Sequence, residues 1–160
     1  MPKTILPNIS IIKQQFRQFS FKEHEVFHWS PRDNCIYYDP IKLTRAAGVY
    51  QLLHEIGHAL SGHTNYESGI QLLKMETEAW QQAQRIAKSY NLKISETQIE
   101  RCLDSYRDWL HLRSKCPSCS TTAVETEANL FHCFNCLQDW KVPADQRSRS
   151  YRLKLVNQLI

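Results

Sequence analysis

The chain has no long apolar run. Met1–Ser20 contains no hydrophobic stretch of signal-peptide length, and no segment approaches the roughly 18 apolar residues that a membrane-spanning helix needs. The sequence also lacks internal repeats and low-complexity segments. We therefore expect a globular, cytoplasmic protein without a membrane partner.

The sequence also has little excess charge. Its formal net charge is +4 over 160 residues, which is too small to indicate a nucleic-acid partner by itself. This length allows one catalytic domain and a small appendage. Four of the six cysteines form two CxxC pairs, which leaves Cys35 and Cys102 as core thiols without a pairing pattern. This cysteine usage is typical of a reducing compartment.

Residues 54 to 58 read His-Glu-Ile-Gly-His and fit the pattern HExxH. Helical residues four apart lie one above the other, so His54 and His58 can reach one Zn²⁺ while Glu55 faces the metal-bound water. The alternative is that the motif occurs by chance, as two surface histidines on a solvated helix that bind no metal. The sequence around the motif favours the metal site.

The helix that carries the motif is expected to be buried. Apolar residues occupy almost every turn from 46 to 60, with Thr44 as the expected N-cap and Ser61 and Gly62 as the expected end. Polar side chains inside a core need partners, and a metal supplies one. Gly57 costs about 1 kcal/mol in a helix interior, which favours close packing of another backbone against the motif.

A catalytic zinc generally has three protein ligands and an open position. From about Gly69 to Tyr90 a 3.6-residue pattern predicts a helix, and Glu76 lies in its apolar stripe. Glu78 is rotated from Glu76 by roughly 200° and falls on the polar face. We therefore predict Glu76 as the third ligand and Glu78 as an exposed neighbour. The alternative is that Glu76 pairs with a basic side chain.

His63 and Glu67 are the other candidates for a third ligand. His63 follows the glycine that ends the helix, and its spacing departs by one residue from the pattern HExxHxxGxxH. We expect it to be a loop or rim histidine.

Two short strands are predicted before the motif. Glu25 to Ser30 and Cys35 to Asp39 are rich in β-branched and aromatic residues, and residues 31 to 34 form a turn between them. We expect the second strand to be the edge strand of a small sheet, with Tyr37 and Tyr38 on its opposite faces.

The segment HEIGHALSGH, followed by a helix with Glu76-Thr77-Glu78-Ala79, resembles zincin metallopeptidases of the gluzincin type, and most of all the ImmA/IrrE-like family. The resemblance covers roughly residues 24 to 90, and it departs at Trp80, where many relatives carry Asn or Asp. It implies an α+β zincin-like domain, with a short antiparallel sheet over an HExxH helix and a glutamate helix. A substrate would lie along the edge strand.

A second metal site is predicted near the end of the chain. Cys116 and Cys119 form one CxxC pair, and Cys133 and Cys136 form another after a gap of thirteen residues. This spacing is typical of a zinc ribbon, whose four thiolates leave no position for water, so the zinc is structural. A redox pair and disulfides are the alternatives. The expected small core around this zinc consists of Phe131, Phe134 and Trp140.

These patterns divide the chain into a catalytic domain at 1–113, a zinc ribbon at 114–142 and a basic tail at 143–160. Two more helices are expected, from Ile9 to Phe19 and from Ser95, with Gln98 completing a capping box, to about Leu112. The tail carries Arg147, Arg149, Arg152 and Lys154 and no acidic residue after Asp145. It is either a helix that docks through Tyr151, Leu155 and Leu159, or a basic arm that meets phosphate.

A zincin followed by a zinc ribbon is also similar in layout to the SprT-like proteases, which act on DNA-bound proteins. That family uses a third histidine, and this chain has no histidine between His63 and His111. We expect a zinc-dependent endopeptidase with one catalytic and one structural zinc, protein or peptide substrates, and Glu55 as the general base. The alternative is a catalytically idle zincin scaffold that binds nucleic acid or protein through the ribbon and the basic tail.

Overall fold

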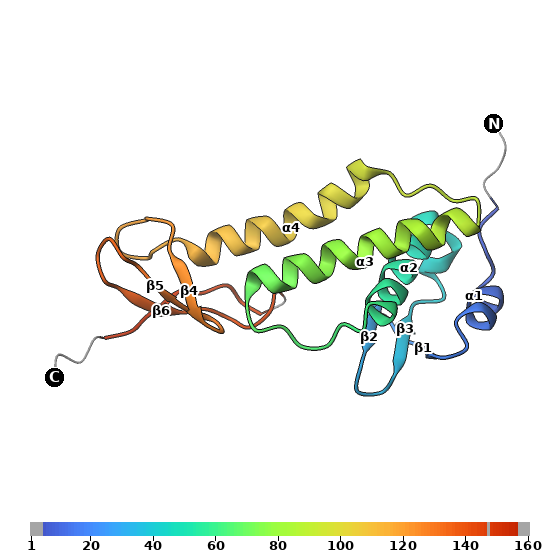
Figure 1. The fold of residues 1–160 in the computed structure, drawn as a ribbon, viewed down its shortest axis with the longest axis horizontal. Helices are drawn as coiled ribbons and strands as arrows, with labels where there is room; N and C mark the ends of the chain where they lie inside the picture. Colours follow the sequence, from blue (N-terminus) through green and yellow to red (C-terminus); the bar gives the residue numbers. More distant parts are fainter. Residues whose placement is uncertain (1–4, 147, 157–160) are drawn as a thin grey trace. The chain divides into compact units, whose positions relative to one another are not determined.

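The computed structural model describes residues 5–146 and 148–156, in which helices and two small sheets form an α+β fold (Figure 1). The helices are α1 (Ile9–Gln15), α2 (Ala46–Leu60), α3 (Gly69–Ser89) and α4 (Glu96–Ser114), with a short 3-10 turn at Lys42–Thr44. The strands are β1 (Ser20–Glu23), β2 (His28–Ser30), β3 (Cys35–Tyr38), β4 (Val124–Glu127), β5 (Leu130–His132), β6 (Asp139–Lys141) and β7 (Leu153–Lys154).

Internal contacts divide the chain into two units. Unit 1 comprises residues 1–64 and 75–99, and unit 2 comprises residues 65–74 and 100–160. The division falls within α3, and it assigns the whole HExxH region to unit 1 and both CxxC pairs to unit 2. The domain limits after residues 113 and 142 stay predictions.

The sheet of unit 1 has the strand order β1-β3-β2. Strand β3 pairs in parallel with β1 and antiparallel with β2, so the sheet is mixed, whereas we expected an antiparallel one. The prediction that residues 35–39 form the edge strand was wrong. β1 was not anticipated from the sequence, and its addition places β3 in the centre, with β1 and β2 as the two edge strands.

Helix α2 is the buried centre of unit 1, as its apolar composition predicted. Leu52, Leu53 and Ile56 have no exposed surface, and α2 packs on β2 and β3 (Figure 1). The expected N-cap was wrong, because Thr44 lies in the 3-10 turn and donates its hydroxyl to the carbonyl of Ile41 instead.

The ends of the other helices follow local signals. Asn8 caps α1 by accepting a hydrogen bond from the Ser10 amide at 2.9 Å. α1 ends four residues earlier than the expected Phe19. Ser95 accepts from the Gln98 amide at 3.2 Å and begins α4, as predicted.

The sheet of unit 2 has the order β4-β5-β6-β7, with antiparallel pairing throughout. Phe131 and Trp140 stack with ring centroids 5.6 Å apart and belong to the core there, together with Cys116, Cys133 and Val142. Phe134 was expected in this core, but it is 72% exposed. It directly follows the buried Cys133, and its own side chain lies on the surface.

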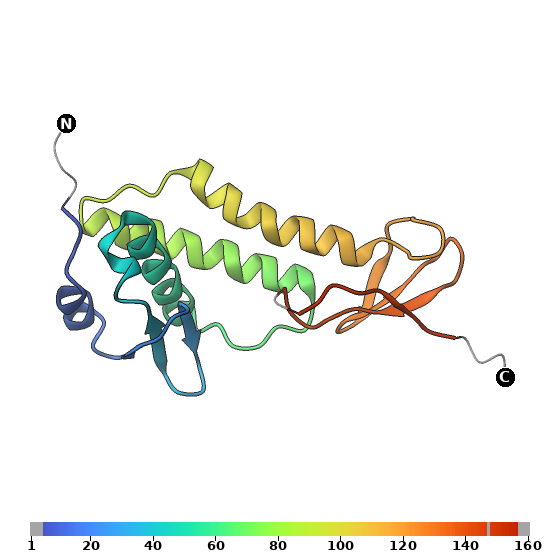
Figure 2. The same cartoon turned by 180° about the vertical axis from the view of Figure 1, so that it is seen from behind.

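The described part of the basic tail contains no helix, so the docking helix predicted there was wrong. Its strand β7 pairs with β6, and Figure 2 shows this dark red segment running beside the sheet. Arg152 donates to the carbonyl of Lys115 at 2.6 Å. Tyr151 and Leu155 lie in this extended segment, whereas Arg147 and Leu159 lie outside the described residues.

Candidate metal centres

The two histidines of HExxH lie on the same side of α2. Their Nε2 atoms are 3.1 Å apart, and the residues are 8% and 9% exposed. This arrangement follows from their spacing, since residues four apart on a helix are neighbours. Helix geometry thus presents two nitrogen ligands from a buried surface.

Glu76 reaches these nitrogens from α3. Its Oε2 lies 3.0 Å from Nε2 of His54, and its Oε1 lies 3.4 Å from Nε2 of His58. One ligand atom from each of the three residues lies within 4.8 Å of the others. The structure brings the predicted ligands together, and two imidazoles with one carboxylate are a donor set that suits zinc. The three residues therefore fit a zinc ion, although their role as ligands stays a prediction.

The charges in this group favour an ionised glutamate. Burial opposes the ionised form of Glu76, but hydrogen bonds and charges from His54 and His58 outweigh it and lower the pKa of Glu76 to about 2. Burial also opposes protonation of His58, but the hydrogen bond and charge of Glu76 and the charge of Glu55 raise the pKa of His58 above its usual value. A buried anion held between two imidazoles is a favourable position for a cation.

Gly57 makes this approach of α3 possible. A Cβ atom on Gly57 would lie 2.3 Å from the carbonyl oxygen of Ala79, far inside contact distance. The prediction that another backbone packs closely against the motif is confirmed. Ala79 lies three residues after Glu76, so this contact places the glutamate beside the histidines.

Glu55 faces the sheet edge. Its Oε2 accepts a hydrogen bond of 2.8 Å from the backbone amide of Trp29, in β2. In an antiparallel pair, the amide and the carbonyl of one residue point to the same side, either toward the partner strand or away from it. Trp29 therefore turns its backbone groups away from β3 and toward the HExxH helix. No feature of the sequence had indicated this contact.

His63 lies in the loop after α2, as predicted, but it is buried and not at an exposed rim. Only 8% of it is exposed, and its Nδ1 lies 2.8 Å from Nδ1 of His58. Its Nε2 lies 3.0 Å from Oε2 of Glu78. Glu78 is outside the ligand group, as expected, but it is half-buried and paired with His63 instead of simply exposed. Glu67, the remaining candidate, is exposed in the loop before α3.

Trp80 covers the other histidine. It is 4% exposed, and its ring stacks on that of His54 with centroids 4.3 Å apart. Nδ1 of His54 is buried and has no hydrogen-bond partner among the described residues. The two histidines of the motif thus differ at Nδ1: that of His58 faces His63, whereas that of His54 faces no hydrogen-bonding group among the described residues.

The four cysteines of the CxxC pairs form the second group. Sγ of Cys116 lies 3.5 Å from that of Cys136, and Sγ of Cys119 lies 3.5 Å from that of Cys133. All four ligand atoms lie within 4.8 Å of one another, so they can hold one metal ion. This close approach of two sequence-distant pairs fits a closed four-thiolate site.

Both CxxC pairs have the same backbone turn. The amides of Ser120 and Leu137 donate to the carbonyls of Cys116 and Cys133, at 3.0 and 2.8 Å. These two residues have φ angles of 63° and 60°, which non-glycine residues seldom adopt. Each turn directs two sulfurs to one side, as a metal-binding knuckle requires.

The surroundings of Cys119 and Cys136 shift the pKa values of these two cysteines in opposite directions. A hydrogen bond with Thr121, followed by one from Asn135, lowers the pKa of Cys119 to about 5. The Gln138 amide favours the thiolate of Cys136, but burial and the three neighbouring thiols raise the pKa of Cys136 to about 12. Four adjacent sulfurs cannot all carry charge without a cation, so a metal would complete this site.

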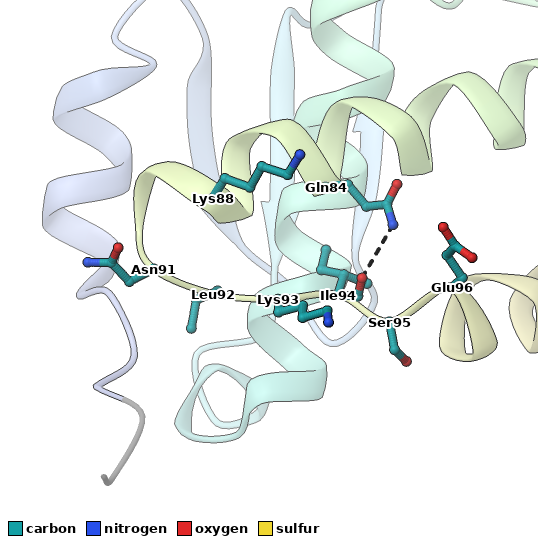
Figure 3. A pocket seen from close by; sticks show the side chains of 8 residues that line it. All are labelled: Gln84, Lys88, Asn91, Leu92, Lys93, Ile94, Ser95 and Glu96. Atoms are coloured by element: carbon teal, nitrogen blue, oxygen red, sulfur yellow. Dashed lines mark hydrogen bonds between the residues drawn. The ribbon is translucent and has the colours of Figure 1, made fainter.

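A hollow of about 780 Å³ lies elsewhere in unit 1, between the end of α3 and residues 91–96 (Figure 3). Gln84 crosses it to donate to the carbonyl of Ile94 at 3.3 Å. None of the eight labelled side chains belongs to either metal group.

No protein-family model, curated protein or solved structure matches this chain. Among the described residues, no helix has the length and apolar character to cross a bilayer.

Proposed function

We propose that the protein is a zinc-dependent endopeptidase of the zincin type, related to the ImmA/IrrE-like family that the HExxH segment resembles. The observation that carries this proposal is the convergence of His54, His58 and Glu76 within 4.8 Å, next to Glu55 on the same helix. The four-cysteine group would hold a second, structural zinc.

Zinc held by His54, His58 and Glu76 would act as a Lewis acid toward the peptide carbonyl and lower the pKa of water. Glu55 is the general base in this proposal. Its Oε2 is held by the Trp29 amide, so its orientation is set, and its other oxygen would take a proton and return it to the leaving amine.

Strand β2 supports the choice of a peptide substrate. It is an edge strand, and an extended peptide can add to such an edge through main-chain hydrogen bonds. The Trp29 amide on this edge is already bonded to Glu55, so a peptide would pair with the other backbone groups of the edge. A peptide along β2 would therefore pass beside the proposed base.

The test combines metal content with cleavage of an unfolded, fluorescently labelled protein. We expect two zinc ions per wild-type chain and measurable cleavage. Glu55→Gln should retain both ions and lose at least about 100-fold in turnover, because general-base catalysis contributes at least that much. Glu76→Ala should retain only the ribbon zinc.

Glu25→Gln is the matched control, since Glu25 is an exposed glutamate before β2 and should have no effect. Full turnover in Glu55→Gln, or one zinc ion in the wild type, would contradict the proposal. The basic tail as a nucleic-acid-binding segment stays a prediction.

A further inference from the structure

Two residues outside the ligand group form a chain of hydrogen bonds behind His58. Nδ1 of His58 lies 2.8 Å from Nδ1 of His63, and Nε2 of His63 lies 3.0 Å from Oε2 of Glu78. On its other side, Nε2 of His58 faces His54 at 3.1 Å and Glu76 at 3.4 Å. His58 therefore joins the ligand group to the pair formed by His63 and Glu78.

The hydrogen-bonding chemistry of this chain determines where the protons lie. An ionised carboxylate only accepts hydrogen bonds, so His63 donates to Glu78 from Nε2. The Nδ1 atom of a neutral His63 is then an acceptor, and His58 must donate to it from its own Nδ1. When the ring of His58 is neutral, as metal binding requires, this leaves its lone pair on Nε2, the atom that faces His54 and Glu76.

The backbone holds His63 in this position. Gly62 has a φ of 65°, and the amide of His63 donates to the carbonyl of His58 at 3.1 Å. The amide of Gly62 donates to Ala59 at 3.2 Å, which completes a Schellman turn. The indole of Trp29 also donates to the carbonyl of His63 at 2.9 Å. The end of α2 thus turns His63 back onto the last histidine of the motif.

His54 has no comparable support. Its Nδ1 has no partner among the described residues, and the ring is held by stacking on Trp80. Both histidines are buried, but only His58 has a hydrogen-bond partner at its Nδ1 atom. The pair behind His58 is a specific arrangement of two side chains from different elements.

We infer that His63 and Glu78 are positioning residues that hold the proton of His58 on Nδ1 and so direct its Nε2 lone pair into the ligand group. This inference rests on the proposed zinc site. Side chains that hydrogen-bond to the far nitrogen of a metal-binding histidine typically contribute about 10- to 100-fold to metal affinity. His63 acts through His58 and does not itself touch the metal.

The first test is zinc affinity, measured by titrating the full chain after one equivalent has filled the four-cysteine site. His63→Phe keeps the size of the side chain but removes the acceptor, and we expect about 10- to 100-fold weaker binding at the second site. His63→Gln can accept from His58 and donate to Glu78, so it should restore most of the affinity. His111→Phe, at an exposed position of α4, is the matched control. Unchanged affinity in His63→Phe would overturn the inference.

The second test reads the tautomer of His58 in zinc-free protein, from the ¹⁵N shifts of its ring at a pH high enough to keep the ring neutral. We expect the Nδ1–H form in wild type and a mixture of tautomers in His63→Phe. Glu78→Ala, at a half-exposed position, should shift the same population if His63→Phe fails to fold. The same tautomer in every variant would overturn the inference. Because no metal is present, this result is independent of whether the wild type binds a second zinc or cleaves peptides.

Discussion

The backbone amide of Trp29 lies 2.8 Å from Oε2 of Glu55, so the edge strand of the sheet is hydrogen-bonded to the glutamate of HExxH. The same tryptophan donates its indole N–H to the carbonyl of His63 at 2.9 Å. One residue of β2 therefore contacts both the proposed base and the residue that supports His58. It links the sheet to Glu55 and to the loop after α2.

The contact with Trp29 predicts different costs for two substitutions of Glu55. Glu55→Gln keeps an acceptor for the Trp29 amide, so the free energy of unfolding should change little. Glu55→Ala leaves this part-buried amide unpaired and should lower that free energy by about 1–2 kcal/mol. Urea unfolding of zinc-free protein measures both. Equal stability of the two variants would show that the contact contributes nothing.

The close approach of Gly57 to α3 predicts that Gly57→Ala is damaging. The added Cβ would lie 2.3 Å from the carbonyl oxygen of Ala79, and a backbone atom cannot give way as a side chain can. We expect a loss of about 2–3 kcal/mol or more, together with loss of the zinc that depends on Glu76. Gly62→Ala is the contrast: nothing lies within 4 Å, and only its φ of 65° is unfavourable, at about 1–2 kcal/mol. Thermal unfolding and zinc content would distinguish the two, and a harmless Gly57→Ala would refute the argument.

The stacking of Trp80 on His54 predicts a role for the flat ring itself. Trp80→Ala opens a cavity at a buried position and should cost about 3–5 kcal/mol. Trp80→Phe retains an aromatic face and should cost clearly less, with zinc still bound. Calorimetry with and without zinc checks both variants. If Trp80→Phe loses zinc as completely as Trp80→Ala, the indole has a function beyond stacking.

The pKa of Glu76 predicts how the zinc-free protein responds to acid. A carboxyl whose pKa falls from 4.5 in the unfolded chain to about 2 in the fold contributes stability above pH 4.5 that is lost as the pH falls toward 2. Glu76→Gln should remove this part of the pH dependence. The measurement is urea unfolding between pH 6 and pH 2.5, and parallel curves for the two proteins would contradict the assignment.

The four-cysteine group predicts that unit 2 depends on metal. Cys116 and Cys133 are part of its small core, and the Trp140 indole donates to the carbonyl of Arg113 at 2.9 Å. Cys133→Ser should therefore release one zinc and speed hydrogen exchange at this indole. Cys35→Ser, which changes a cysteine outside the cluster, should leave that exchange slow. Slow exchange in Cys133→Ser would show that the core forms without the metal.

Local periodicity determined much of this protein from sequence. His54 and His58 share one side of a helix because a helix repeats every 3.6 residues. The same rule separated Glu76 from Glu78, although they are only two positions apart. The two CxxC pairs likewise signal a four-sulfur group, because each pair turns two side chains to one side. These features follow from neighbours along the chain, which a sequence displays directly.

Only the tertiary structure decided which segments meet. β1 pairs in parallel with β3, and β2 lies at the edge on the other side. This strand order depends on pairing between residues that are distant in sequence. His63 is a loop residue, as the sequence indicated, but the left-handed Gly62 turns it back onto His58, and Glu78 contacts it from another helix. Trp29 approaches Glu55 for the same reason: backbone groups at a sheet edge take partners that no local pattern specifies.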